Sequence, residues 1–312
     1  MPAGINIVMG AREWVMLITL SLLWGGSFFF VGVAVHDLPP LTIVNLRVGI
    51  GAIALWAIAL AMGLRPPTNA RIWFAFAGLS VLNNMIPFVL IAWAQIQIAS
   101  GLASILNATT PLFTVVVAGL LLTDEKATPL KLAGVVTGFL GVVVMIGVPD
   151  TGAAANSWAP FAVLVAAFCY ACGGVYGRRF KAMAIDPVFV ATGQVSVSAL
   201  LLLPITLSVD GLPDLAGPSA ATWASVVALA VLSTSVAYVL YFRILEAAGA
   251  TNLLLVTLLV PVSAILLGAV FLHEDLRPVD FAGMALIALG LSAIDGRPWR
   301  PAIWRRMLRL PG

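Results

Sequence analysis

The sequence predicts an all-α membrane protein with ten transmembrane helices, arranged as two inverted five-helix repeats with cytoplasmic N- and C-termini. Composition, the length of the apolar segments and an internal repeat carry this prediction. Hydrophobic residues make up 62% and charged residues 9% of the 312 residues, and the mean hydropathy is +1.09. Soluble domains average about 45–50% apolar and about 25% charged residues. The composition therefore excludes a soluble domain, and it also excludes a disordered chain, which would be highly charged.

Ten apolar segments are each close to the roughly 20 residues that a helix needs to cross about 30 Å of hydrocarbon. They are 14–35, 41–62, 71–94, 98–122, 129–147, 158–177, 187–208, 219–242, 247–272 and 278–295. Proline-containing turns such as 38–40, 65–67 and 186–187 separate them. Continuous apolar runs indicate helices, because a membrane β-strand alternates over about ten residues. The first segment is interpreted as a retained helix and not a signal peptide, since nine others follow.

The distribution of Lys and Arg predicts the orientation. With a cytoplasmic N-terminus, most basic residues fall on the cytoplasmic side: Arg12, Arg65, Arg71, Lys126, Lys131, Arg178, Arg179, Lys181, Arg243, Arg297, Arg300, Arg305, Arg306 and Arg309. Only Arg277 falls outside, and Arg47 lies within a segment. We therefore expect a multi-pass protein of the cell inner membrane. Its basic tail is predicted to contact anionic lipid headgroups, and nucleic acid is not an expected partner.

Matching residues recur in the same order about 149 positions apart. Pro40 and Pro187 are 147 apart, and Trp73 and Trp223 are 150 apart. Four further residues recur at 149: Glu125, Gly134, Gly141 and Gly147 match Glu274, Gly283, Gly290 and Gly296. A repeat with five crossings is odd, so the second copy enters the membrane from the opposite side. The predicted domains are therefore repeats at 1–150 and 151–296, followed by a basic cytoplasmic tail at 297–312. Two inverted halves around a shared site are the plan of many secondary transporters.

Several motifs resemble a known family. The run from Trp24 to Phe28 resembles the Trp-Gly-x-x-Phe signature of EamA-type transporters, which belong to the drug/metabolite transporter superfamily. The segments 111–125 and 261–274 resemble the family's proline, apolar run and glutamate, and Arg47 lies where the family often has an arginine. The segment 171–174 departs from the Trp-Gly signature in the second half. The resemblance extends through residue 296 and implies movement of a small metabolite, an amino acid or related compound, with export as the common direction.

Arg47 is the only charged residue in the interior of a predicted span, away from the span ends. An ionisable side chain at that depth is energetically unfavourable and marks a functional candidate. One interpretation is a fixed positive charge that binds a substrate carboxylate or phosphate. The other is a structural arginine that reaches outward to the membrane surface or binds helix carbonyls.

Uncharged polar residues gather at mid-depth in several spans. Ser233, Thr234, Ser235 and Tyr238 correspond by the repeat to Asn83, Asn84, Met85 and Phe88. These side chains either line a central cavity or join helices by hydrogen bonds. Prolines after several of the polar residues release backbone groups that a cavity tolerates. Aromatic residues at similar depth either form the walls of a substrate site or pack. The candidate substrate-binding residues are Arg47, Trp24, Asn83, Asn84, Asn107, Thr110, Tyr170, Ser233, Tyr238 and Thr257.

The spans 129–147 and 278–295 are predicted to be packing helices, because Gly134, Gly138 and Gly141 have the spacing of close helix crossings. They either brace the two halves or form a homodimer surface. Acidic residues fall at loops or span ends. Glu125 and Glu274 are expected to pair with nearby Lys126, Lys131 or Arg277, or to cap helices.

The sequence carries no protease motif of the Gly-x-Ser-x-Gly or His-Glu-x-x-His type and no phosphate-binding loop. We therefore predict no enzyme activity, no cofactor and no metal site. The function predicted from the residues is a secondary transporter that exposes one site alternately to each side, with a small molecule as its substrate. A membrane scaffold or sensor is the alternative, and an intramembrane enzyme is a weaker one.

Overall fold

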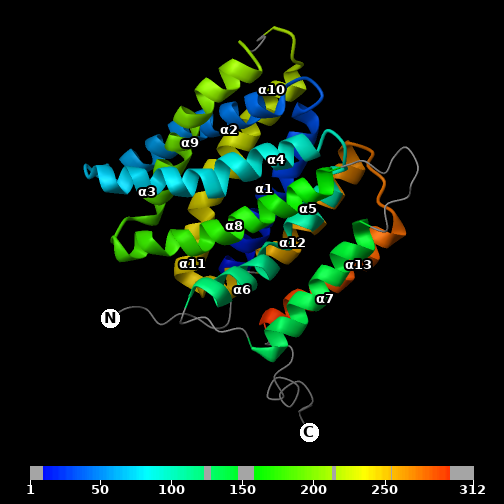
Figure 1. The fold of residues 1–312 in the computed structure, drawn as a ribbon. Helices are drawn as coiled ribbons and strands as arrows, with labels where there is room; N and C mark the ends of the chain where they lie inside the picture. Colours follow the sequence, from blue (N-terminus) through cyan, green and yellow to red (C-terminus); the bar gives the residue numbers. More distant parts are fainter. Residues whose placement is uncertain (1–9, 123–127, 147–157, 213–215, 254, 296–312) are drawn as a thin grey trace.

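The computed structural model describes residues 10–122, 128–146, 158–212, 216–253 and 255–295 (Figure 1). Every regular element within these ranges is helical. The elements are α1 Ala11–Ala34, α2 Pro40–Ala61, α3 Ala70–Ser80, η1 Val81–Met85, α4 Ile86–Ala94, α5 Ser100–Asn107, α6 Thr110–Leu121, α7 Pro129–Ile146, α8 Ala159–Ala182, α9 Pro187–Val209, α10 Ala220–Ala230, η2 Val231–Val236, α11 Ala237–Leu253, α12 Val256–Phe271 and α13 Pro278–Asp295. The elements η1 and η2 are π-helices that continue the helices on either side of them.

Seven helical stretches in the described ranges are long and apolar enough to cross a membrane. They are Ala11–Ala34, Pro40–Ala61, Ala70–Ala94, Ser100–Leu121, Ala159–Ala182, Pro187–Val209 and Ala220–Ala248. Three apolar helices are shorter: Pro129–Met145, Val256–Phe271 and Pro278–Ile294. The protein is thus a helical multi-pass membrane protein.

Most helix boundaries lie within a few residues of the predicted segments, and the exceptions have a common cause. Helix α8 continues to Ala182, beyond the predicted end at 177, because Arg178, Arg179 and Lys181 are good helix formers that an apolar window leaves out. Helix α11 likewise continues to Leu253, and α12 begins at Val256 instead of 247. Apolar patterning therefore locates a span, whereas helix propensity extends it into the polar flanks.

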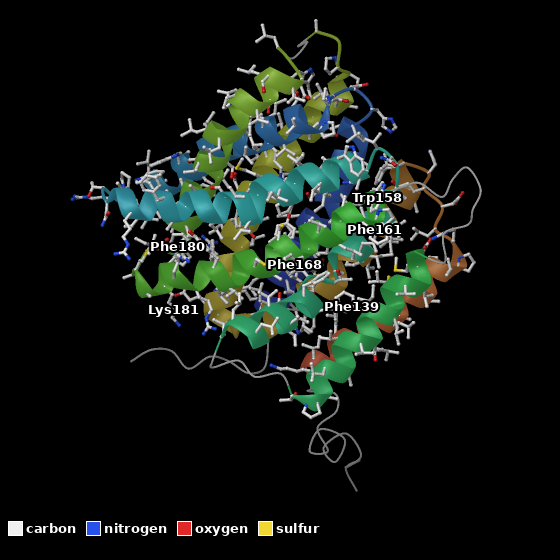
Figure 2. All side chains as sticks on the ribbon, in the orientation of Figure 1. Phe139, Trp158, Phe161, Phe168, Phe180 and Lys181 are labelled. Atoms are coloured by element: carbon white, nitrogen blue, oxygen red, sulfur yellow. The ribbon has the colours of Figure 1, made fainter. Side chains whose placement is uncertain are left out.

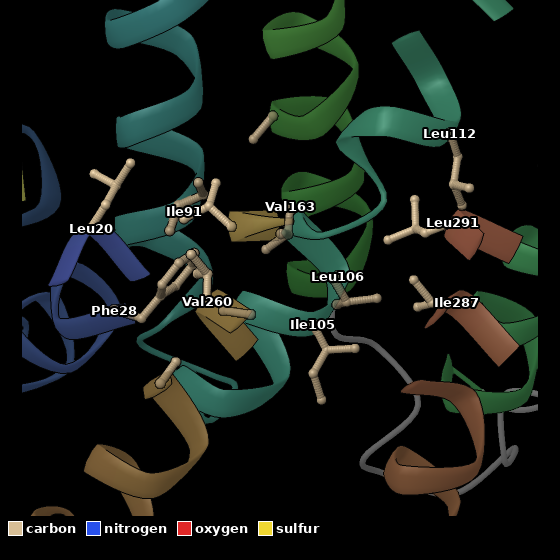
Figure 3. Packing of buried hydrophobic residues seen from close by; sticks show 14 of the residues in the cluster. Leu20, Phe28, Ile91, Ile105, Leu106, Leu112, Val163, Val260, Ile287 and Leu291 are labelled. Atoms are coloured by element: carbon tan, nitrogen blue, oxygen red, sulfur yellow. The ribbon is translucent and has the colours of Figure 1, made fainter. Parts of the chain in front are cut away.

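The largest core cluster draws on both halves of the chain (Figure 3). Leu20 and Phe28 of α1 lie in the same cluster as Ile105 of α5, Val163 of α8 and Val260 of α12, and all five side chains are buried. A second cluster joins α2, α4 and α9. Because lipid is as apolar as these side chains, close packing and not apolar burial holds such helices together.

Helices α7 and α13 lie side by side at one edge of the molecule (Figure 1). A Cβ at Gly290 would lie 2.5 Å from the carbonyl oxygen of Gly134, and one at Gly283 would lie 2.6 Å from that of Gly141. The predicted packing role of these glycines is confirmed, since their backbones touch. The pairing of 134 with 290 and of 141 with 283 also means that the two helices run antiparallel.

Exposed aromatic side chains follow α8 along the outside of the molecule (Figure 2). Trp158 and Phe161 lie near its first residue and Phe168 near its middle, whereas Phe180 and Lys181 lie near its last turn (Figure 2). Trp158 is 70% exposed, which suits an aromatic anchor at a membrane surface.

Three carboxylates cap helices that belong to the opposite half of the chain. Asp37 accepts hydrogen bonds from the backbone and hydroxyl of Ser219, at 2.9 and 2.8 Å, and from the hydroxyl of Thr222 at 2.6 Å. Asp210 accepts from the backbone and hydroxyl of Thr42 at 2.9 and 2.7 Å. These bonds satisfy the free N–H groups at the starts of α10 and α2. The hydrogen bonds that Asp37 accepts lower its pKa from 3.8 to about 2, and the bond from Thr222 has the largest effect, followed by those from Ser219.

Glu274 is the third of these capping carboxylates. It accepts hydrogen bonds from the backbone and hydroxyl of Ser100, at 2.8 and 2.7 Å, and from the backbone of Gly101 at 3.3 Å. Glu274 was expected either to pair with a base such as Arg277 or to cap a helix, and the structure shows the cap. Arg277 forms an ion pair with Asp280 instead, at 2.8 Å. Glu125 and the basic tail lie outside the described residues, so their predicted roles stay predictions.

Candidate functional site

The two π-helices occupy equivalent places in the two halves. Helix α3 begins at Ala70 and η1 at Val81, and α10 and η2 begin 150 residues later, at Ala220 and Val231. A π-helix inserts one extra residue into an α-helix and is frequent at functional sites. Both π-helices coincide with the polar segments singled out in the sequence, residues 83–84 and 233–235.

The first π-helix contacts α9 through side-chain amides and hydroxyls. Asn83 donates to the side-chain oxygen of Gln194 at 3.1 Å and to the hydroxyl of Tyr238 at 3.4 Å. Asn84 donates to Ser198 at 3.1 Å and accepts from Tyr238 at 3.4 Å. Asn84, Gln194 and Ser198 are almost completely buried. The amides of one half therefore meet polar side chains of the other half.

The second π-helix contacts α2, where Arg47 lies. The Nε of Arg47 donates to the hydroxyl of Thr234 at 3.0 Å, and that hydroxyl donates to the carbonyl of Leu229 at 2.9 Å. The guanidinium carbon lies 3.6 Å from the centre of the Phe88 ring, a cation–π contact. Ser235 donates to the carbonyl of Gly51 at 3.1 Å, which holds α2 against η2.

One group of hydrogen bonds joins Arg47 to Thr234, and a second joins Asn83 and Asn84 to α9 and Tyr238. Tyr238 lies near enough to Arg47 for an electrostatic interaction, which brings the two groups together. We call the set the central polar cluster: Arg47, Asn83, Asn84, Gln194, Ser198, Thr234 and Tyr238. Arg47 is only 8% exposed, and no described carboxylate forms an ion pair or hydrogen bond with it. It binds a side-chain hydroxyl and a ring. Both expected roles of Arg47, substrate binding and a structural contact, stay predictions.

Of the three aromatic candidates, Tyr238 belongs to the cluster and Tyr170 and Trp24 do not. Tyr170, like Tyr238, is near enough to Arg47 to interact with its charge. Tyr170 packs against both large core clusters, whereas Trp24 packs against Tyr241 with ring centroids 5.7 Å apart. Tyr170 therefore borders the cluster, and the described contacts of Trp24 are packing contacts.

None of the hydrogen bonds that the structure describes joins the remaining candidates to the cluster. Thr110 donates to the carbonyl of Asn107 at 2.7 Å, where the span Ser100–Leu121 breaks between α5 and α6. The side-chain oxygen of Asn107 and the hydroxyl of Ser233 are fully buried without a hydrogen-bond partner. Thr257 is half-buried in the first turn of α12.

Sequence reasoning missed Gln194 and Ser198, although the repeat carries a signal for both. Gln194 follows Arg47 by 147 positions, the same offset that relates Pro187 to Pro40. Ser198 follows Gly51 by the same offset. A search for charged residues and prolines does not select Gln194 or Ser198. Adding the repeat offset of 147 to the position of Arg47 identifies Gln194 directly.

The cluster offers one cation, several amides and hydroxyls. These groups can bind a polar molecule through hydrogen bonds and one fixed positive charge. Among the described residues, no three His, Cys, Asp or Glu side chains gather as metal ligands do. Reversible recognition of a polar molecule is therefore the chemistry that these groups support.

Several known proteins are similar to this chain over most of its length, and their names describe transporters. An uncharacterized transporter, YoaV of Bacillus subtilis (strain 168), is 26% identical over 277 residues, covering 88% of this chain and 94% of that protein. A probable amino-acid metabolite efflux pump of Escherichia coli (strain K12) is 27% identical over 304 residues, covering 95% and 99%. An uncharacterized inner membrane transporter, YedA of the same strain, is 28% identical and covers 89% of each chain.

A solved crystal structure has the same fold, with a TM-score of 0.64 and 21% identity over 91% of this chain and 97% of that one. Residues 12–147 and residues 157–294 each match the EamA-like transporter family. The family and the relatives' names point to a membrane transporter and not to an enzyme. The chain belongs to the EamA-like transporter family, within the drug/metabolite transporter superfamily.

Proposed function

We propose that the protein is a secondary transporter that moves a small metabolite, an amino acid or related compound, out across the inner membrane by alternating access. The central polar cluster is the observation that carries the proposal. Its groups come from both halves, and it holds a buried arginine without a carboxylate partner. A movement of one half against the other would therefore open and close the space around this cluster.

The proposed architecture is ten transmembrane helices in two inverted five-helix repeats, with both termini in the cytoplasm. The repeats comprise residues 1–150 and 151–296, and a basic tail follows at 297–312. The antiparallel crossing of α7 and α13 supports the inversion, because Gly134 and Gly283 are equivalent positions, as are Gly141 and Gly290. The equivalent π-helices support it as well. The name of one relative supports the inner membrane as the location.

Within this proposal, Arg47 binds an anionic group of the substrate, while Asn83, Asn84, Ser233 and Tyr238 bind its polar groups. Trp24, Asn107, Thr110, Tyr170 and Thr257 complete the candidate set. Among the described residues, four fully buried side-chain polar atoms have no hydrogen-bond partner, and two of them belong to the candidates Asn107 and Ser233. A bound molecule or water would satisfy such atoms.

The test is flux in proteoliposomes loaded with a panel of labelled amino acids, organic anions and small amines. Wild-type protein is expected to give saturable flux of an acid or zwitterion above that of empty vesicles. The Arg47→Ala variant is expected to lose this flux while keeping its gel-filtration profile. Flux of no compound in the panel would contradict transport of this substrate class and favour a scaffold or sensor. Flux that survives in the variant would assign Arg47 a structural role.

A further inference from the structure

The charge of the central polar cluster restricts what it binds. Arg47 carries one positive charge at 8% exposure, and its only described polar partner is the hydroxyl of Thr234. A buried charge is unfavourable unless an opposite charge compensates it. A bound monoanion makes the cluster neutral, whereas a zwitterion leaves its net charge at plus one and a cation makes it more positive.

The contacts of Arg47 also restrict how an anion binds. The guanidinium carbon lies over the Phe88 ring, and Thr234 accepts the hydrogen bond of the Nε. Only the two terminal nitrogens remain without a described hydrogen bond, and neither belongs to the fully buried unpartnered atoms. They therefore border space that admits water. A planar carboxylate fits two parallel bonds from this end of the guanidinium.

The side chains of the cluster other than Arg47 are neutral. Gln194 lies at the position equivalent to Arg47 and holds Asn83 at 3.1 Å through its side-chain oxygen. Both described bonds of the Asn83 side chain are donated by its amide nitrogen, so its oxygen is the remaining acceptor. One neutral acceptor suits a neutral polar group. An ammonium has three donors and carries a charge that no described carboxylate in the cluster compensates.

We infer that the transported compound is an organic monoanion without a free ammonium group. Its carboxylate binds end-on to the terminal nitrogens of Arg47, and a neutral polar group binds at Gln194 and Asn83. This inference rests on the proposed function and narrows it to amino-acid derivatives whose amine is absent or acylated. Each repeat then binds a different group of the substrate: the first through the cation of Arg47, and the second through the amide of Gln194 at the equivalent position.

The experiment compares three compounds with one side chain: phenylalanine, N-acetylphenylalanine and phenylpyruvate. Binding is measured as the thermal shift of the purified protein in detergent, and transport as flux in proteoliposomes. The two anions are expected to bind about tenfold or more tightly than the amino acid, because only they neutralise Arg47. Equal or tighter binding of the amino acid would overturn the inference while leaving transport intact. Binding of the anions without flux would instead contradict the proposed transport.

Variants assign the selectivity to named side chains. Arg47→Gln is expected to remove the preference for the anions, and Arg47→Lys to retain part of it. The double variant Arg47→Gln/Gln194→Arg is expected to restore it, since the cation then lies at the equivalent position of the other repeat. Ser208→Ala, an exposed hydroxyl near the end of α9, is the matched control. Undiminished anion preference in Arg47→Gln would overturn the inference. If this variant does not fold, the three-compound series on wild-type protein still decides it.

Discussion

At the scale of single residues, hydroxyl groups determine how the buried charge is held. Thr234 accepts from the Nε of Arg47 while donating to the carbonyl of Leu229, so one side chain joins the guanidinium to the backbone of α10, just before η2. Arg47 was predictable because it is the only charged residue in the interior of a predicted span. Thr234 was predictable as one of several polar residues. Its role as the partner of Arg47 was not, because the choice of partner depends on how the two helices are rotated against each other.

Replacing Thr234 separates this positioning role from simple packing. Thr234→Val removes the acceptor of the Arg47 Nε and leaves a buried donor unpaired, so we expect a loss of about 1–3 kcal/mol in unfolding free energy. Thr234→Ser retains the hydroxyl and is the control. Unfolding in detergent measures both variants. A Thr234→Val variant at least as stable as Thr234→Ser would show that the hydrogen bond does not stabilise this contact.

Asp37 makes the stability depend on pH. Its pKa in the folded protein is about 2, compared with an ordinary value of 3.8. The carboxylate therefore stabilises the fold above pH 3.8, and this contribution disappears as the pH falls from about 3.8 to about 2. We expect the melting temperature of the wild type to decrease over this interval by more than that of Asp37→Asn. Parallel curves for the two proteins would contradict the cap at α10.

At the scale of elements, the helices were largely predictable, whereas the π-helices were not. Apolar runs and prolines located the spans to within a few residues at most ends. A π-helix adds one residue without changing composition, so apolar periodicity does not reveal it. The pairs Asn83–Asn84 and Ser233–Thr234 marked both places as polar, and their matching positions became meaningful only with the geometry.

The crossing of α7 and α13 depends on contact between glycine backbones. In Gly290→Ala the new Cβ would lie 2.5 Å from the carbonyl of Gly134, so the helices must separate. We expect a loss of about 1–3 kcal/mol in unfolding free energy. Gly174→Ala is the control, because its Cβ meets no atom within 4 Å and alanine favours a helix interior by about 0.5–1 kcal/mol. A Gly290→Ala variant as stable as the control would contradict the close crossing.

At the scale of the whole molecule, the capping carboxylates join the two halves at one end. Asp37 and Asp210 line the same pocket of about 300 Å³ there, and Glu274 caps α5. Under the proposed topology this is the non-cytoplasmic end, so the structure corresponds to a conformer closed on that side. The repeat was visible in the sequence, and capping was one of the two expected roles of Glu274. The partners of these caps were not visible, because residues such as Asp37 and Ser219 are 182 positions apart.

The most direct test of the account is the accessibility of the central polar cluster from each side of the membrane. A single cysteine replaces Asn83 in a Cys169→Ser/Cys172→Ser background and is treated with a membrane-impermeant maleimide from either side. We expect labelling from the cytoplasmic side when the caps are intact, and additional labelling from the opposite side once Glu274→Ala removes one cap. A cysteine shielded from both sides in both proteins would contradict a site that alternates between the two faces of the membrane.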